Sequence, residues 1–156
     1  MVNTMAIVLL ATLVGTAGAG DLPPRRKNPL LAWLRSGAYR ATYTPEPAIH
    51  ASAIGVHGQT VRTWYGPVLV EDLRAGRTAF RKGAAMVKEL YFGGEQVVGW
   101  AVMRKVRGRS GTTGRGWLFY EAVDGSNDGA IFGRGKALCA GCHRSGTDYL
   151  RSDFRP

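Results

Sequence analysis

Cysteine is scarce in this chain: Cys139 and Cys142 are the only two among 156 residues. If both hold a cofactor, no structural disulfide can form, which excludes a fold stapled by disulfide bonds. The length suits a single domain. Hydrophobic residues make up 45% of the chain, which is enough for an ordinary core.

Acidic residues are also few, with 11 Asp and Glu against 21 Lys and Arg, giving a net charge of +10. A surface of this sign favours acidic partners and anionic surfaces. The basic residues are scattered and form no recognisable module with aromatic platforms, so we expect no nucleic acid partner. No Gly-Lys-Ser or Gly-Lys-Thr sequence is present, so a phosphate-binding loop is not expected either.

Residues 1–19 contain no charged side chain. An apolar run from Met5 to Gly15 is followed by the small-x-small pattern Ala17-Gly18-Ala19. This combination predicts a secretory signal peptide that is cut after Ala19. The run is shorter than the roughly 20 apolar residues that a membrane-spanning helix needs. We therefore expect export to the bacterial periplasm, with residues 20–27 as a polar linker.

Two short helices are predicted from their boundary residues. Pro29 and Gly37 bound a helix over 29–36, and Pro67 and Gly76 bound another over 67–75. The stretch 41–58 contains two prolines and several small residues, so we predict that it is mostly loop.

Strands are predicted where β-branched and aromatic residues gather, at 59–65, 84–92, 96–106 and 117–123. The last three follow one another through Gly93-Gly94 and through the glycine-rich stretch 107–116. Connections of this kind make consecutive strands pair antiparallel. The expected fold class is therefore α+β, a mainly antiparallel sheet with a few short helices.

The chemistry of the chain is indicated by "LCAGCHR", residues 138–144, which contains the spacing C-x-x-C-H. In such a motif each thiol adds across one haem vinyl group, and the histidine becomes an axial ligand of the iron. A zinc site would commonly need a second pair of ligands, and His50 and His57 lack the spacing for one. The sequence therefore predicts one covalently attached haem c per chain, held by Cys139, Cys142 and His143.

A sixth iron ligand is not evident from the sequence. No methionine follows His143, and the only methionines after residue 19, Met86 and Met103, fall in predicted strands. Each is expected to fill the core rather than to bind iron. The long amphipathic helices of a four-helix cytochrome are also missing. We therefore expect the strands to form the distal side of an open haem site.

Several segments together resemble a known family. "KGAAMVKELY", "WAVMRKV", "GWLFYEAV" and the late "CAGCH" followed by "DYL" are similar to the cytochrome P-460 family, whose fold the cytochromes c′-beta share. The resemblance covers about Ala32 to Tyr149. It implies a haem domain over 28–156, with the haem on a C-terminal helix or loop packed against the sheet, and a homodimer. One departure is Leu150-Arg151, where the family tends to have Val-Phe.

Lys88 is the most unusual residue of the predicted strand 84–92. Strand alternation puts it on one face with Met86, Leu90 and Phe92. Burial among such neighbours lowers the pKa of an amine and makes it a neutral nucleophile. The resemblance implies that Lys88 is joined covalently to the haem macrocycle. The alternatives are a lysine reaching solvent at the sheet edge, and the unlinked haem of the cytochromes c′-beta.

Arg62 and Glu121 are the candidate distal residues. Arg62 could place its guanidinium over the distal pocket and order water or a polar ligand, unless it is an exposed strand residue. Glu121 shares a strand face with Phe119 and is the first candidate for a distal base, ahead of Glu89 and Glu95. The alternative for Glu121 is an exposed position at the strand end.

Three functions remain open at this point. An enzyme of the P-460 type would oxidise hydroxylamine to nitrous oxide or nitric oxide, which needs an open site and a base. A protein of the c′-beta type would bind nitric oxide without turnover. A simple electron carrier would have a six-coordinate iron. The expected partners are hydroxylamine or nitric oxide and a redox protein with an acidic surface, while His57 is expected to be structural.

Overall fold

The computed structural model describes residues 22–53 and 55–156. The predicted signal peptide, residues 1–19, and the start of the expected linker lie outside these ranges. Among the described residues, none of the helices has the length and apolar character of a membrane span.

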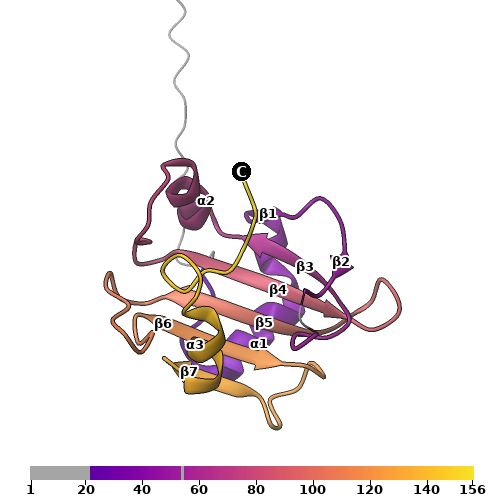
Figure 1. Cartoon of the computed structure of the whole chain (residues 1–156). Helices are drawn as coiled ribbons and strands as arrows, with labels where there is room; N and C mark the ends of the chain where they lie inside the picture. Colours follow the sequence, from indigo (N-terminus) through magenta and orange to yellow (C-terminus); the bar gives the residue numbers. More distant parts are fainter. Residues whose placement is uncertain (1–21, 54) are drawn as a thin grey trace, which may run out of the picture.

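The described part of the chain forms one sheet of seven strands, all paired antiparallel. Its strands are β1 (Thr44–Pro45), β2 (His50–Ala51), β3 (Thr60–Tyr65), β4 (Ala85–Tyr91), β5 (Val97–Lys105), β6 (Trp117–Ala122) and β7 (Ile131–Arg134). The order across the sheet is β1-β3-β4-β5-β6-β7, and β2 pairs with β3 as well (Figure 1). The predicted α+β class with a mainly antiparallel sheet is confirmed.

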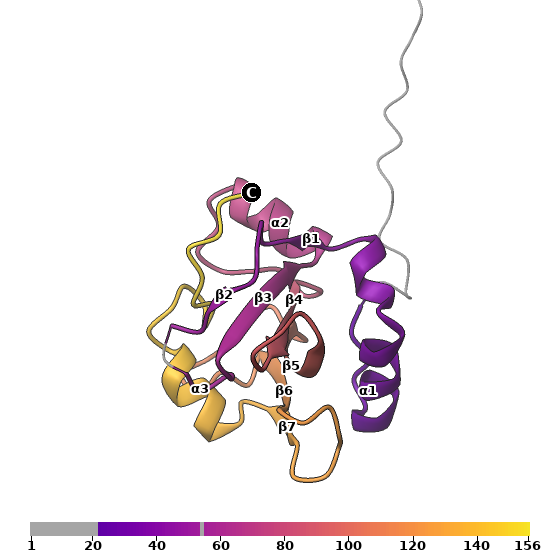
Figure 2. The same ribbon diagram turned by 90° about the vertical axis from the view of Figure 1, so that its right-hand side faces the viewer.

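Within the described residues three α-helices accompany the sheet: α1 (Lys27–Ser36), α2 (Pro67–Arg74) and α3 (Ala137–His143), with a short 3₁₀ helix at Ala38–Ala41. Helix α1 begins two residues earlier than predicted and ends, as predicted, at Gly37, whose φ of 68° suits a glycine. Helices α1 and α3 lie on opposite sides of the sheet (Figure 2). The sheet is therefore the middle layer of the molecule.

The layer between α1 and the sheet is a core of large apolar side chains. Leu30, Leu31 and Leu34 of the helix are buried in one cluster with Val87 and Val102 of the sheet. The three leucines share one side of α1 because helical residues three and four apart lie together. This face of the sheet is closed by the helix.

The opposite face carries a second core cluster, which includes Met86, Met103 and Phe119 of the sheet and Ala140 of α3. Side chains alternate along a strand. The alternation therefore sends Met86 and Lys88 of β4 towards α3, while Val87 and Glu89 point towards α1. The fold places the late helix over the strand face that carries Lys88.

Candidate functional site

The C-x-x-C-H motif lies within α3, where residues three or four apart face the same side of the helix. Cys139 and Cys142 are free thiols, the first half-buried and the second exposed. Both line a cavity of about 450 Å³ together with His143. Burial, helped by the charge of Glu121, raises the pKa of the Cys139 thiol to about 11.

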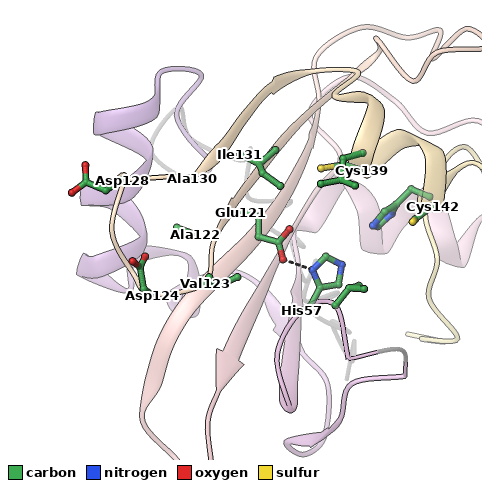
Figure 3. A pocket seen from close by; sticks show the side chains of 14 residues that line it. His57, Glu121, Ala122, Val123, Asp124, Asp128, Ala130, Ile131, Cys139 and Cys142 are labelled. Atoms are coloured by element: carbon green, nitrogen blue, oxygen red, sulfur yellow. Dashed lines mark hydrogen bonds and ion pairs between the residues drawn. The ribbon is translucent and has the colours of Figure 1, made fainter.

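This cavity is one of three adjoining hollows between α3, the sheet and the segment before β3. Their volumes are about 450, 30 and 560 Å³. His57 and His143 line all three. Figure 3 shows the thiols of α3 on one side of the 450 Å³ cavity and the side chains of His57 and Glu121 beside them.

His143 is oriented by a backbone group. Its Nδ1 lies 2.9 Å from the carbonyl oxygen of Tyr149, which can only accept, so Nδ1–H donates. Burial lowers the pKa of His143, against the effect of this hydrogen bond, and favours the neutral ring. A neutral imidazole with Nδ1–H engaged in this way is the usual arrangement of a metal-ligating histidine, because Nε2 is left for the metal.

Lys88 reaches the same region from the sheet. Together with His143 it lines two of the hollows, those of about 30 and 560 Å³. Burial lowers the pKa of the Lys88 amine, while the charges of Glu46 and Glu121 act in the opposite direction. Lys88 therefore shares cavity walls with residues of the C-x-x-C-H helix.

Glu121 also lines this region, at the end of β6, with a side chain that is only 13% exposed. One of its carboxylate oxygens lies 2.7 Å from Nδ1 of His57. The His57 ring is 6.1 Å from the ring of His143, and the Phe119 ring is 5.8 Å from it. Sequence reasoning assigned His57 a structural role and missed its place beside Glu121 in the cavity wall.

Arg62 is not brought to the cavity. In β3 it lies opposite Glu89 of β4, so it points to the α1 face of the sheet. There its Nε donates to the carbonyl oxygen of Glu46 at 2.9 Å, and its guanidinium lies 5.2 Å from the Trp64 ring. The expected position over the distal pocket is therefore wrong, because the strand places Thr63 and not Arg62 on the face of Lys88.

Glu89 lies on that same α1 face, buried to 1% exposure. Its carboxylate accepts hydrogen bonds from Tyr39 at 2.5 Å, Tyr91 at 2.6 Å and Trp64 at 2.8 Å. A buried carboxylate with several donors is a satisfied structural group. Of Glu89 and Glu121, it is Glu121 that lines the cavity beside α3.

No protein-family model matches the chain, and no curated protein matches its sequence. What the site can do therefore follows from the chemistry of its own side chains. It combines two thiols and an imidazole on α3 with an amine and a carboxylate on the sheet. Such a group could hold a cofactor through sulfur and nitrogen and could exchange protons with a small ligand.

Proposed function

We propose that this chain is an exported cytochrome that carries one covalently bound haem c and oxidises hydroxylamine at it. The observation that carries the proposal is the convergence of Cys139, Cys142 and His143 on cavities whose opposite wall holds Lys88 and Glu121. A volume of about 450 Å³ lies in the range of small-molecule and cofactor sites.

The residues of α3 fit such a group in three respects. Both cysteines are free and face one cavity, so each S–H can add across a vinyl double bond with no leaving group. His143 has its Nδ1 committed to Tyr149, which leaves Nε2 as the ligand atom. The neutral state favoured by burial is also the state that binds a metal.

The bound haem would supply a metal that coordinates hydroxylamine and takes up its electrons. Oxidation of two hydroxylamine molecules to one nitrous oxide and one water releases four protons and four electrons. Glu121 can accept a proton, and its hydrogen bond to His57 holds the carboxylate in the cavity wall. The electrons must pass to a redox partner, for which the net charge of +10 favours an acidic surface.

Lys88 is proposed as a second attachment to the macrocycle. Forming a C–N bond from a macrocycle C–H and a lysine N–H releases two protons and two electrons, so it requires an oxidant such as hydrogen peroxide. Burial, which lowers the pKa of the amine, favours the neutral nucleophile that this reaction needs. The similarity of the segment around Lys88 to the cytochrome P-460 family supports the same role.

Nitric oxide binding without turnover is the second candidate. It is favoured by the apolar side chains of Met86, Met103 and Phe119, which line the hollow beside Lys88. An apolar wall suits a diatomic ligand that needs no proton transfer. An unlinked Lys88 would strengthen this candidate. Export to the periplasm and assembly as a homodimer are parts of both proposals.

The test is to produce the chain with bacterial haem-attachment machinery and to extract it with acidic acetone. The haem is expected to stay with the wild type and to be missing from Cys139→Ala with Cys142→Ala. The retained holoprotein should then convert hydroxylamine to nitrous oxide in the presence of an electron acceptor. Extraction of haem from the wild type would overturn covalent attachment, and binding of nitric oxide without hydroxylamine turnover would select the second candidate.

A further inference from the structure

The turn that follows α3 has an unusual backbone. Asp148 and Tyr149 have φ values of 46° and 71°, and they are the only non-glycine residues with positive φ in the part of the chain that the structure describes. Side chains disfavour this left-handed region, and two such residues in succession persist only where their surroundings hold them. Contacts with distant parts of the chain hold this turn in place.

The Asp148 carboxylate is held from several segments that are distant in sequence. It accepts from the ammonium of Lys105, whose side chain is fully buried, and from the hydroxyl of Ser110. It also accepts from the backbone N–H of Phe80 at 2.8 Å. Donors from the end of β5, the connection after it and the connection before β4 therefore all fix one carboxylate.

The backbone of the turn is anchored as well. The indole N–H of Trp117 donates to the carbonyl oxygen of Asp148 at 2.7 Å, and the Tyr149 hydroxyl donates to the carbonyl oxygen of Gly111 at 2.9 Å. At Gly114 an added Cβ would lie only 2.9 Å from the Tyr149 ring, so the neighbouring loop is closely packed on it. The two residues have little freedom to relax to an ordinary conformation.

The anchored turn fixes the direction in which the carbonyl group of Tyr149 points. The carbonyl oxygen of Tyr149 accepts from Nδ1 of His143 at 2.9 Å. That hydrogen bond fixes which ring nitrogen carries the proton and which way Nε2 faces. Because a carbonyl follows the backbone angles around it, a turn free to relax would not keep this oxygen at His143.

We propose that Asp148, paired with Lys105, is a positioning residue for His143. It holds the left-handed turn so that the Tyr149 carbonyl keeps His143 in the Nδ1–H form with Nε2 towards the cavity. The part of this inference that concerns iron rests on the proposed haem function. There the hydrogen bond makes the imidazole a stronger donor, which favours the oxidised iron and lowers the reduction potential.

The decisive variant is Asp148→Gly combined with Lys105→Met, made in the full chain. Glycine tolerates positive φ and removes the carboxylate, and methionine fills the space of the lysine stem without leaving a buried unpaired charge. The matched control is Asp72→Ala with Arg81→Met. Asp72 is also fully buried and accepts from the side chain and backbone of Arg81, but it holds the end of α2.

The readout is the ¹⁵N spectrum of histidine rings, with the diamagnetic carbon monoxide complex used where haem is bound. In the wild type and the control, His143 should be in the Nδ1–H form with a slowly exchanging proton. In the Asp148 variant that proton should exchange faster, because the Tyr149 carbonyl that accepts from it is no longer held in place. The signals of His50 and His57 should stay unchanged, and the reduction potential of the holoprotein should rise.

A second variant, Ser110→Ala, keeps the ion pair and removes one donor to Asp148. It should shift the His143 exchange rate in the same direction by a smaller factor. An unchanged His143 proton in both variants, with only the melting temperature lowered as in the control, would overturn the positioning role. A chain that shows the His143 effect but carries no haem would overturn the proposed function alone, so the two failures are distinguishable.

Discussion

His57 and Glu121 are 64 residues apart in sequence, yet a hydrogen bond of 2.7 Å joins Nδ1 of the one to a carboxylate oxygen of the other. The pair links the segment before β3 to the end of β6, next to the helix that carries the two thiols. A carboxylate held by an imidazole is well suited to accept a proton and pass it on.

Glu121→Gln should therefore slow hydroxylamine oxidation by about a hundredfold, since a positioned base contributes at least that much. The amide keeps the size of the side chain, so haem content should not change. Turnover is measured by nitrous oxide release under saturating hydroxylamine. Glu95→Gln, the same replacement at an exposed residue of the β4–β5 connection, is the control and should retain the full rate.

The proposed Lys88 linkage should be visible in the peptide map of the mature protein. Trypsin should release one haem-bearing species that contains both the Lys88 peptide and the peptide of Cys139 and Cys142. The wild type should also show a red-shifted absorption band, because an altered macrocycle edge changes its conjugation.

Lys88→Ala should return the spectrum to that of an ordinary c-type haem, and Lys82→Ala, at an exposed residue before β4, should leave it shifted. A Lys88 peptide recovered free of haem by mass spectrometry would count against the linkage. Nitric oxide binding would then become the better interpretation.

The distal side is expected to be open. Met103 is 3% exposed and packed in the core cluster that lies against α3, which makes it a filler of space rather than an available ligand. The ferrous protein should therefore be five-coordinate through His143 and should bind nitric oxide readily. Absorption and resonance Raman spectra report the coordination number. A low-spin spectrum that Met103→Leu or His57→Ala abolishes would instead indicate a six-coordinate electron carrier.

Glu89 should make the fold sensitive to acid. Burial alone would raise the pKa of this carboxyl, but hydrogen bonds from Tyr39, Tyr91 and Trp64 lower it below the ordinary value of 4.5. The ionised carboxylate therefore stabilises the fold above pH 4.5, and this contribution is lost as the pH falls through the lowered pKa.

Glu89→Gln should cost about 2 kcal/mol of unfolding free energy at pH 7, because it weakens hydrogen bonds to a buried charged group. Urea unfolding at pH 7 and again below pH 4 would show the difference from wild type shrinking in acid. Glu95→Gln should show no difference at pH 7. A constant gap between Glu89→Gln and wild type at both pH values would contradict this account.

Much of the fold could be predicted because the signals were local. Pro67 begins α2, Gly37 ends α1, and the alternation of β4 puts Lys88 on a different face from Glu89. The short strand β7 was missed, because four residues containing a glycine give little periodic pattern. The strands β1 and β2 are only two residues long each and lie in the stretch predicted as loop.

The site was only partly predictable, for a physical reason that Arg62 illustrates. Which face a strand residue occupies depends on the register with its neighbour, and the pairing of Arg62 with Glu89 is set by tertiary structure. His57 lies on a connecting segment, where no periodicity indicates direction. Only the assembled fold brings it to Glu121.

The two thiols on α3 are unequally buried, and this difference would set the order in which they react during maturation. Cys142 is exposed, whereas Cys139 is half-buried with a pKa raised to about 11, so its reactive thiolate is rare at neutral pH. In the folded chain an electrophile therefore meets the exposed Cys142 more readily than Cys139, although both thiols line the same cavity. For the proposed haem, the bond to Cys142 is therefore expected to form before the bond to Cys139.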